Sequence, residues 1–227
     1  MQENNMVSVV IPTLNEAGTI RETIKTIKET IEYPYEIIVV DGCSTDNTRE
    51  IVRKEKCKLI VEPRRGYGTA LKAGIAHARG NIILIVDGDG TYKVGDANRL
   101  INALYRENAD LCLGARIYSL ADKSMDVINY IGNKIITFAF NVLYKQNLLD
   151  SQSGFRVLKR SSLDKVHLKE NDMAFATEML VAFAKKGLKI IEIPTTYKLR
   201  VYGKSKLRRV KAGLEIFKVL IKGALER

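Results

Sequence analysis

The sequence has no tryptophan and is poor in proline, cysteine and histidine, with 4, 3 and 2 residues among 227. Cys43, Cys57 and Cys112 are odd in number, far apart, and form no CxxC pair. This argues against a disulfide framework or a cysteine zinc site and favours three structural thiols in a reducing cytoplasm. His77 and His167 are too scattered to suggest a histidine metal site.

Long hydrophobic runs are also lacking. The N-terminal segment MQENNMVSVVIP is polar before a short strand-like run, so it does not resemble a secretory signal. The uncharged stretch 135–144 lies between two lysines and is far shorter than the roughly 20 apolar residues that a membrane-spanning helix needs. We therefore expect a chain that does not itself cross a membrane.

What the sequence does have is positive charge. Lys and Arg number 37 against 26 Asp and Glu, a formal net charge of +11. Such an excess indicates an anionic partner, which composition alone leaves open as nucleic acid, a membrane surface or a phosphorylated substrate. The length and the 46% hydrophobic content predict an ordinary globular domain with a real core.

The first two thirds of the chain alternate strand-like and helix-like segments. Strands are expected at residues 7–11, 36–40, 59–62, 81–86 and 110–113, and helices at 19–31, 44–54, 67–78 and 96–107. Thr19 and Glu22 have the spacing of a helix-capping box. The alternation predicts an α/β fold, with a mainly parallel sheet and helices on both faces.

The last third is more helical, with helices expected at 127–145 and 174–186 and a strand at 188–193. The tail has one apolar face, formed by Leu207, Val210, Leu214, Phe217, Ile221 and Ala224, and another that carries Arg208, Arg209, Lys211, Lys218 and Lys222. We predict one domain over residues 1–206 and a basic amphipathic C-terminal helix over 207–227 that is a candidate for a membrane surface. The helix at 127–145 also fits the description of an interfacial helix. A helix packed on the sheet with a solvated basic face is the alternative, for the tail and for 127–145 alike.

The richest chemistry follows the buried strand at 82–86, which leads directly into Asp87, Gly88 and Asp89. Ligands of open α/β sheets lie outside the carboxyl ends of the strands, where two such carboxylates can hold a divalent cation against a diphosphate. Glu16 and Asp41 follow the first two strands, so all these acids would line one pocket. Solvated or helix-capping turns are the alternative.

Seven motifs carry a family resemblance: PTLNE, VVDGCSTDNT, RRGYGTALKAGIAHARG, DGDGTY, GAR, SGFR and RVYGKSK. In this order they resemble the family 2 glycosyltransferases of the GT-A (Rossmann-like) fold. Within that family the chain looks most like the dolichyl-phosphate mannose and glucose synthases and their bacterial polyprenyl-phosphate relatives. The resemblance extends over residues 7–206.

The resemblance implies a role for each matching position. The nucleotide sugar would be bound by Pro12, Asn15, Glu16, Asp41, Arg65, Gly68, Asp87, Gly88, Asp89, Arg200 and Lys206, with Gly66, Gly68 and Ala70 letting the backbone approach the base and ribose. Mg²⁺ or Mn²⁺ would be held by Asp87 and Asp89. The acceptor phosphate would be contacted by Arg116, Ser153 and Arg156, and the sugar would lie near Asp150 and Glu178. The predicted catalytic set is Asp89, Arg116, Asp150 and Arg200.

Two positions depart from the usual motifs. Gly42 stands where a second acid is common, and Thr91 stands where the mannose synthases have a residue that can assist the metal. The motif that contains Thr91, DGDGT, resembles that of the glucose synthase branch. It favours UDP-glucose or UDP-N-acetylglucosamine as donor and leaves GDP-mannose open.

The predicted reaction is inverting transfer of a hexose to dolichyl or polyprenyl phosphate. A phosphate monoester is largely dianionic near neutral pH, so this acceptor needs little deprotonation. Catalysis can then rest on alignment and on charge stabilisation by the metal and the arginines. Because the acceptor's tail stays in a bilayer, the enzyme is expected at the cytoplasmic face of a membrane as a peripheral protein. The oligomeric state is left open.

Three alternatives accompany this prediction. A polysaccharide or soluble hydroxyl acceptor would require a base, for which Asp150 is the candidate. A nucleotidyltransferase would show a glycine-rich signature near the N-terminus, which is absent. The charge of +11 would suit a nucleic-acid-binding module, but the sequence has no RNP-like aromatic strand, so we expect no nucleic acid partner.

Overall fold

The computed structural model describes residues 6–116, 127–198, 202 and 209–226. Its sheet has seven strands in the order β3-β2-β1-β4-β6-β5-β7. Neighbouring strands are parallel, except that β6 is antiparallel to both β4 and β5. The strands are β1 (Val7–Thr13), β2 (Tyr35–Asp41), β3 (Lys58–Val61), β4 (Ile82–Ile85), β5 (Leu111–Ala115), β6 (Arg156–Lys159) and β7 (Ile190–Pro194). The predicted mainly parallel sheet is confirmed.

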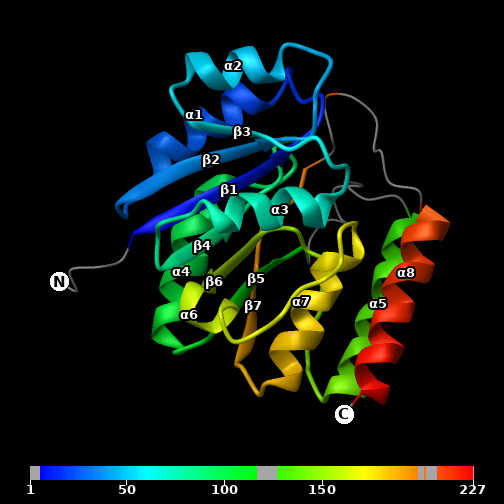
Figure 1. The fold of residues 1–227 in the computed structure, drawn as a ribbon. Helices are drawn as coiled ribbons and strands as arrows, with labels where there is room; N and C mark the ends of the chain where they lie inside the picture. Colours follow the sequence, from blue (N-terminus) through cyan, green and yellow to red (C-terminus); the bar gives the residue numbers. More distant parts are fainter. Residues whose placement is uncertain (1–5, 117–126, 199–201, 203–208, 227) are drawn as a thin grey trace.

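Helices cover both faces of the sheet, as predicted (Figure 1). They are α1 (Ile20–Thr30), α2 (Thr48–Lys54), α3 (Tyr67–Ala76), α4 (Ala97–Arg106), α5 (Val127–Tyr144), α6 (Arg160–Leu163), α7 (Ala174–Lys185) and α8 (Arg209–Leu225), with a 3-10 turn η1 (Val94–Asp96). Alternate residues of a strand point to opposite faces. Val9 therefore packs with α1 and α4, while Val10 packs with α3 and α7.

Two local predictions need correction. The capping box at the start of α1 is wrong, because the Thr19 hydroxyl makes no cap and instead donates to the carbonyl of Gly88 over 2.8 Å. The first turn of α1 is thereby joined to the turn after β4. Strand β6 was not predicted at all. It is short and has Arg156 and Lys159 at its two ends, so it lacks the apolar run by which the other buried strands were found.

The tail helix has two faces that carry apolar residues. The face of α8 that contacts α5 and α7 carries Ala212, Ile216, Leu220 and Gly223. Leu214, Phe217 and Ile221, expected on one apolar face of a membrane-surface candidate, are exposed. The predicted boundary at residue 206 lies outside the described residues. Within the described part of the chain, no helix is both long and apolar enough to span a bilayer.

Candidate active site

The loops that follow β1 and β2 are hydrogen-bonded to each other at the carboxyl edge of the sheet. Asn15 has a left-handed backbone, with φ of 55°. Its side-chain oxygen accepts from the Thr45 amide over 2.7 Å, and its own amide donates to the Ser44 hydroxyl over 2.8 Å. Asp41 is completely buried and accepts from both the amide and the hydroxyl of Ser44. These bonds are those of the turn-forming alternative, and the predicted nucleoside contact of Asp41 stays a prediction.

Glu16 joins the same pair of loops. Its carbonyl accepts from Thr19 and Ile20 at the start of α1, and its amide donates to the Thr48 hydroxyl over 2.9 Å. Pro12 lies near the carboxyl end of β1, and the exposed Arg65 lies shortly after the end of β3. The structure thus brings the predicted nucleoside residues of three strand ends to one edge of the sheet.

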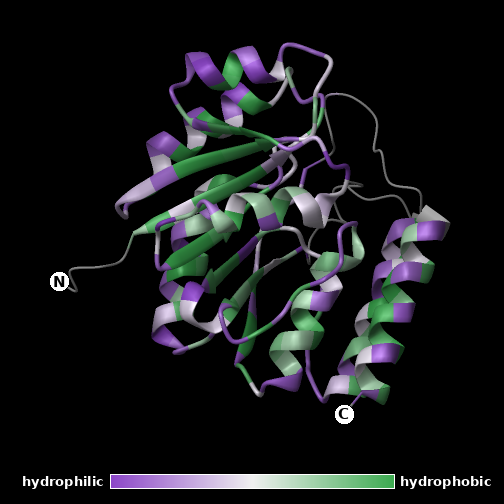
Figure 2. Ribbon diagram, viewed as in Figure 1, coloured by the Kyte–Doolittle hydropathy of each residue, from purple (hydrophilic) through white to green (hydrophobic). Residues whose placement is uncertain are grey.

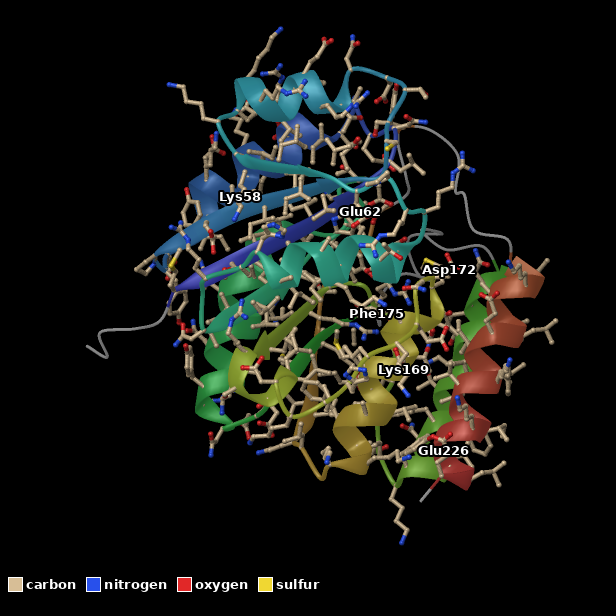
Figure 3. The ribbon with its side chains drawn as sticks, viewed as in Figure 1. Lys58, Glu62, Lys169, Asp172, Phe175 and Glu226 are labelled. Carbon is tan, nitrogen blue, oxygen red and sulfur yellow. The ribbon has the colours of Figure 1, made fainter. Side chains whose placement is uncertain are left out.

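The glycines at the start of α3 leave room for a segment that is distant in the chain. A Cβ at Gly68 would lie 2.6 Å from the Cβ of Phe175 and 2.7 Å from the carbonyl oxygen of Glu170. A Cβ at Gly66 would lie 2.2 Å from the carbonyl oxygen of Asn171. Phe175 and its neighbours lie where the start of α7 meets α3 (Figure 3). Gly68 thus leaves space for this segment of the chain, and its predicted role beside the base and ribose stays a prediction.

Asp87 and Asp89 follow the end of β4, as expected. Burial and the neighbouring Asp89 carboxylate raise the pKa of Asp87 to about 7, although the Tyr67 hydroxyl donates to it. One oxygen of Asp89 accepts from the amide and the hydroxyl of Thr91, over 3.1 and 2.7 Å. Burial is the larger of the two causes, and the second, repulsion between the two carboxylates, is the one that a bound cation would relieve. The two aspartates therefore fit a divalent cation.

No cluster of three or more His, Cys, Asp or Glu suited to a metal occurs among the described residues. Asp87 and Asp89 are thus the two described carboxylates that would hold the cation. Thr91 lies beside this pair. It orients Asp89, and its carbonyl accepts from the Lys198 amide over 2.7 Å.

Arg116 and Asp150 form a nearly buried bidentate pair beyond the end of β5. The Nε and NH2 atoms of Arg116 donate to the two carboxylate oxygens over 2.6 and 2.8 Å, and the Arg116 amide donates over 3.0 Å. The guanidinium lies 5.3 Å from the ring centroid of Tyr197. Although burial alone would raise the pKa of Asp150, the charge and hydrogen bonds of Arg116 hold it below its ordinary value. A carboxylate so engaged is a weak base.

Ser153 and Arg156, the predicted phosphate contacts, are both buried beside the turn before β6. Ser153 is fully buried, and its hydroxyl donates to the Gly114 carbonyl over 2.6 Å. Arg156 is only 2% exposed, and its guanidinium donates to the carbonyls of Ser153, Ser151 and Ala176. Their contact with an acceptor phosphate stays a prediction. Both fix the turn before β6, while the positive charge of Arg156 acts on Asp87 and lowers its pKa.

Glu178, expected near the sugar, holds a segment of the chain in the structure. Its carboxylate accepts from the amides of Lys169 and Glu170, over 2.8 to 3.0 Å, and so holds the segment before α7. Arg200 and Lys206 lie outside the described residues. Tyr202, between them, is described, and a Cβ at Gly18 would lie 2.3 Å from its ring. The RVYGKSK segment thus touches the loop after β1 at this residue.

Sequence reasoning missed the aromatic residues that surround these charges. The Tyr92 hydroxyl accepts from the Gly154 amide over 2.8 Å at the turn before β6, and the Tyr92 ring contacts that of Tyr197 edge-on. Tyr67 contacts Asp87. Tyr67 and Tyr92 belong to the motifs RRGYG and DGDGTY, which the sequence analysis identified. Nothing in these motifs indicated which residues the two tyrosines contact.

Known proteins are similar to this chain both in sequence and in fold. Residues 8–167 match the family described as Glycosyl transferase family 2. Glycosyltransferase AglJ of Haloferax volcanii is 34% identical over 87% of this chain, which spans 64% of that protein. The dolichyl-phosphate hexose transferase of the same organism is 29% identical over 96% of this chain and 94% of its own length. The dolichyl-phosphate beta-glucosyltransferase of Saccharomyces cerevisiae is 29% identical over 86% of this chain and 67% of its own length.

Solved structures agree with the fold. Glucosyl-3-phosphoglycerate synthase from Mycobacterium tuberculosis, in complex with Mn²⁺, UDP and glucosyl-3-phosphoglycerate, superposes with a TM-score of 0.75 at 20% identity, covering 97% of this chain and 80% of that one. The predicted GT-A fold is confirmed. Since the family match extends over most of its length, the chain belongs to glycosyl transferase family 2.

Proposed function

We propose that the protein transfers a hexose from a nucleotide sugar to a dolichyl or polyprenyl phosphate, with inversion at the anomeric carbon. Two relatives with this kind of acceptor in their names match the chain over most of its length. UDP-glucose or UDP-N-acetylglucosamine is the favoured donor and GDP-mannose the alternative. A UDP complex among the proteins of the same fold, and the glucosyltransferase among the relatives, support the UDP sugars.

The observation that carries the proposal is the Arg116–Asp150 pair. A hydroxyl acceptor needs a base, but Asp150 already accepts from the Nε and NH2 atoms of Arg116 and from the Arg116 amide. A lipid phosphate needs no such base, since its nucleophilic oxygen is already charged. The lipid phosphate needs a cation that holds its attacking oxygen in line with the sugar, and we assign this role to Arg116. The proposed roles for Arg116 and Asp150 are therefore acceptor positioning and support of that arginine.

On the donor side, Asp87 and Asp89 would hold Mg²⁺ or Mn²⁺. A bound cation of this type neutralises charge on the departing nucleotide diphosphate. Thr91 keeps Asp89 oriented for that position, and Tyr67 does the same for Asp87. Arg200 and Lys206 remain the proposed contacts for the donor phosphates.

The test compares polyprenyl phosphate with free polyprenol as acceptor for labelled nucleotide sugars. We expect transfer only to the phosphate, and a product in which the sugar is linked through phosphorus. Arg116→Ala should lose transfer but keep nucleotide binding, whereas Arg116→Lys should recover part, because lysine keeps the charge without the planar two-pronged contact. Arg106→Ala, at an exposed arginine of α4, is the control. Efficient transfer to polyprenol or to a soluble sugar would refute the proposed acceptor.

A further inference from the structure

Tyr197 follows β7 and lies among the charged groups of the site. Its side chain is half-buried, and its hydroxyl interacts with the charges of Arg116, Asp89 and Asp87. Figure 2 shows that the loops beyond the carboxyl ends of the strands are more hydrophilic than the strands themselves. An aromatic side chain held among such loops can do more than fill the core.

The ring of Tyr197 lies against the proposed acceptor arginine. The guanidinium carbon of Arg116 lies 5.3 Å from the centre of the ring, within the distance at which an aromatic face attracts a cation. Asp150 holds the same guanidinium by two hydrogen bonds. Since the charge of Arg116 also acts on Asp87, more than one carboxylate attracts this arginine. The ring and Asp150 together favour its position beside Asp150.

The hydroxyl of Tyr197 reaches the other half of the site. A hydrogen bond joins it to the side chain of Thr91. The Thr91 hydroxyl in turn donates to Asp89 over 2.7 Å. Asp89 is one of the two carboxylates that fit a divalent cation, so a single side chain separates Tyr197 from a group that would bind the metal.

The backbone of Tyr197 is fixed to the same loop. Tyr197 forms an antiparallel bridge with Tyr92, and the Lys198 amide donates to the Thr91 carbonyl over 2.7 Å. The rings of Tyr92 and Tyr197 meet edge-on, with their centroids 5.0 Å apart. The side chain of Tyr197 is therefore held in place between Arg116 and the loop after β4.

We propose that Tyr197 is a positioning residue that serves both substrates, each through a different part of its side chain. The ring holds Arg116 for the acceptor phosphate. The hydroxyl, acting through Thr91, holds Asp89 for the metal on the donor side. The role of the ring rests on the proposed function, because it needs an acceptor phosphate at Arg116, whereas the role of the hydroxyl needs only the metal site.

A purely structural role is the alternative, because Tyr197 also packs against the core cluster that contains Tyr92 and Phe155. Tyr35, at the start of β2, provides the matched control. It packs against the same cluster and is also half-buried, but it lies at the amino ends of the strands, away from the site. Substitutions of Tyr35 thus reproduce the loss of packing without the proposed effects.

Removal of the hydroxyl alone tests the donor half of the inference. Tyr197→Phe keeps the ring, so the KM for a short isoprenyl phosphate in detergent should be unchanged. Its affinity for Mn²⁺ in the presence of UDP or GDP, measured from the electron paramagnetic resonance of free Mn²⁺, should fall about fivefold, the loss expected from one hydrogen bond. In a Thr91→Val background the same substitution should have no further effect, because the hydroxyl acts through Thr91. An unchanged Mn²⁺ affinity, or a full effect without the Thr91 hydroxyl, would overturn this half.

Removal of the ring tests the acceptor half. Relative to Tyr197→Phe, Tyr197→Leu should raise the KM for the isoprenyl phosphate about fivefold, from the lost contact between ring and cation, and leave the KM for the nucleotide sugar unchanged. The control Tyr35→Leu should lower the thermal midpoint by a similar amount, yet keep both KM values and the Mn²⁺ affinity of the wild type. An equal rise of both KM values in Tyr197→Leu would identify loosened packing and refute the role of the ring.

The proposed function and this inference fail in different ways. If the wild type binds Mn²⁺ with a nucleotide but transfers sugar to no isoprenyl phosphate, the proposed function fails and the role of the ring fails with it. Mn²⁺ binding by Tyr197→Phe then still decides the role of the hydroxyl. If the wild type uses isoprenyl phosphate and Tyr197→Leu has the same KM for it, the proposed function stands and the role of the ring is wrong.

Discussion

Replacing Asp150 by Asn distinguishes the two roles open to this carboxylate. If Asp150 is the base for a hydroxyl acceptor, the variant should lose catalysis and keep its stability. If it supports Arg116, as we propose, the variant should lose stability as well. Asn has nearly the same shape, but it has no charge, and its amide group would face a donor of Arg116.

The size of the stability loss follows from the burial of the pair. The side chains of Arg116 and Asp150 are 10% and 9% exposed. Removing one partner of a buried ion pair costs about 3–5 kcal/mol, and the small exposure of Arg116 places the expected loss at about 3 kcal/mol. In a domain of this size that lowers the thermal midpoint by about 6–12 °C. Asp164→Asn, at an exposed acid after α6, should change stability by no more than about 0.5 kcal/mol.

The effect should also depend on pH. The folded state holds the pKa of Asp150 below its ordinary value, so the stability from its ionised form is complete above the unfolded pKa of about 3.9. It is lost as the pH falls through the lower, folded pKa. Thermal unfolding followed by circular dichroism should show the full difference between wild type and variant at neutral pH and little difference in strong acid. An unchanged midpoint with a kcat lowered by orders of magnitude would instead identify Asp150 as the base.

Three further predictions concern other parts of the site. Asp89→Asn removes an anionic metal ligand at little change in shape, so sugar transfer should fall by orders of magnitude with a nearly unchanged thermal midpoint; full activity of the wild type in EDTA would contradict this role. Gly68→Ala introduces a methyl group into the packed contact with the start of α7 and should cost about 1–3 kcal/mol in urea unfolding, whereas Gly132→Ala, which has open space around it, should be neutral or stabilising. Gly18→Ala should raise the KM for the nucleotide sugar by displacing the Tyr202 ring, and Tyr202→Ala should offset part of that effect, with a coupling of about 1 kcal/mol; strictly additive effects would mean that the contact does not form in solution.

The sheet was readable from the sequence where its strands are buried on both faces. Segments such as β1 and β4 are continuous runs of branched apolar residues bounded by turn residues, which is the pattern of a central parallel strand. Strand β6 was missed because Arg156, at its start, is a charged residue that only the finished fold can bury. Its guanidinium is satisfied by the carbonyls of Ser151, Ser153 and Ala176, and the last of these comes from α7.

The site was readable as a set of motifs but not as a set of contacts. The sequence placed Asp87 and Asp89 after a buried strand, where the structure has them. It could not separate residues directed at a ligand from residues that hold those positions, because Gly68 and Ser153 are enclosed by segments distant in the chain. The same holds for α8, where helical periodicity revealed an apolar stripe but not which of two stripes packs inward.

The antiparallel direction of β6 has a consequence for how this architecture can vary. Because β5 ends and β6 begins at the same edge of the sheet, the chain between Ala115 and Arg156 leaves that edge and returns to it. Arg116 and Asp150, 34 positions apart, join the two ends of this excursion. The segment that contains α5 is therefore an insertion between β5 and β6 whose two ends are held together. Doubling the length of such a segment costs only about 0.6 kcal/mol in loop-closure entropy. Related chains could therefore differ in the length or the composition of this segment and keep the same strand register and the same proposed donor-binding edge. The outward face of α5 could then change while the sheet of the enzyme stays as it is.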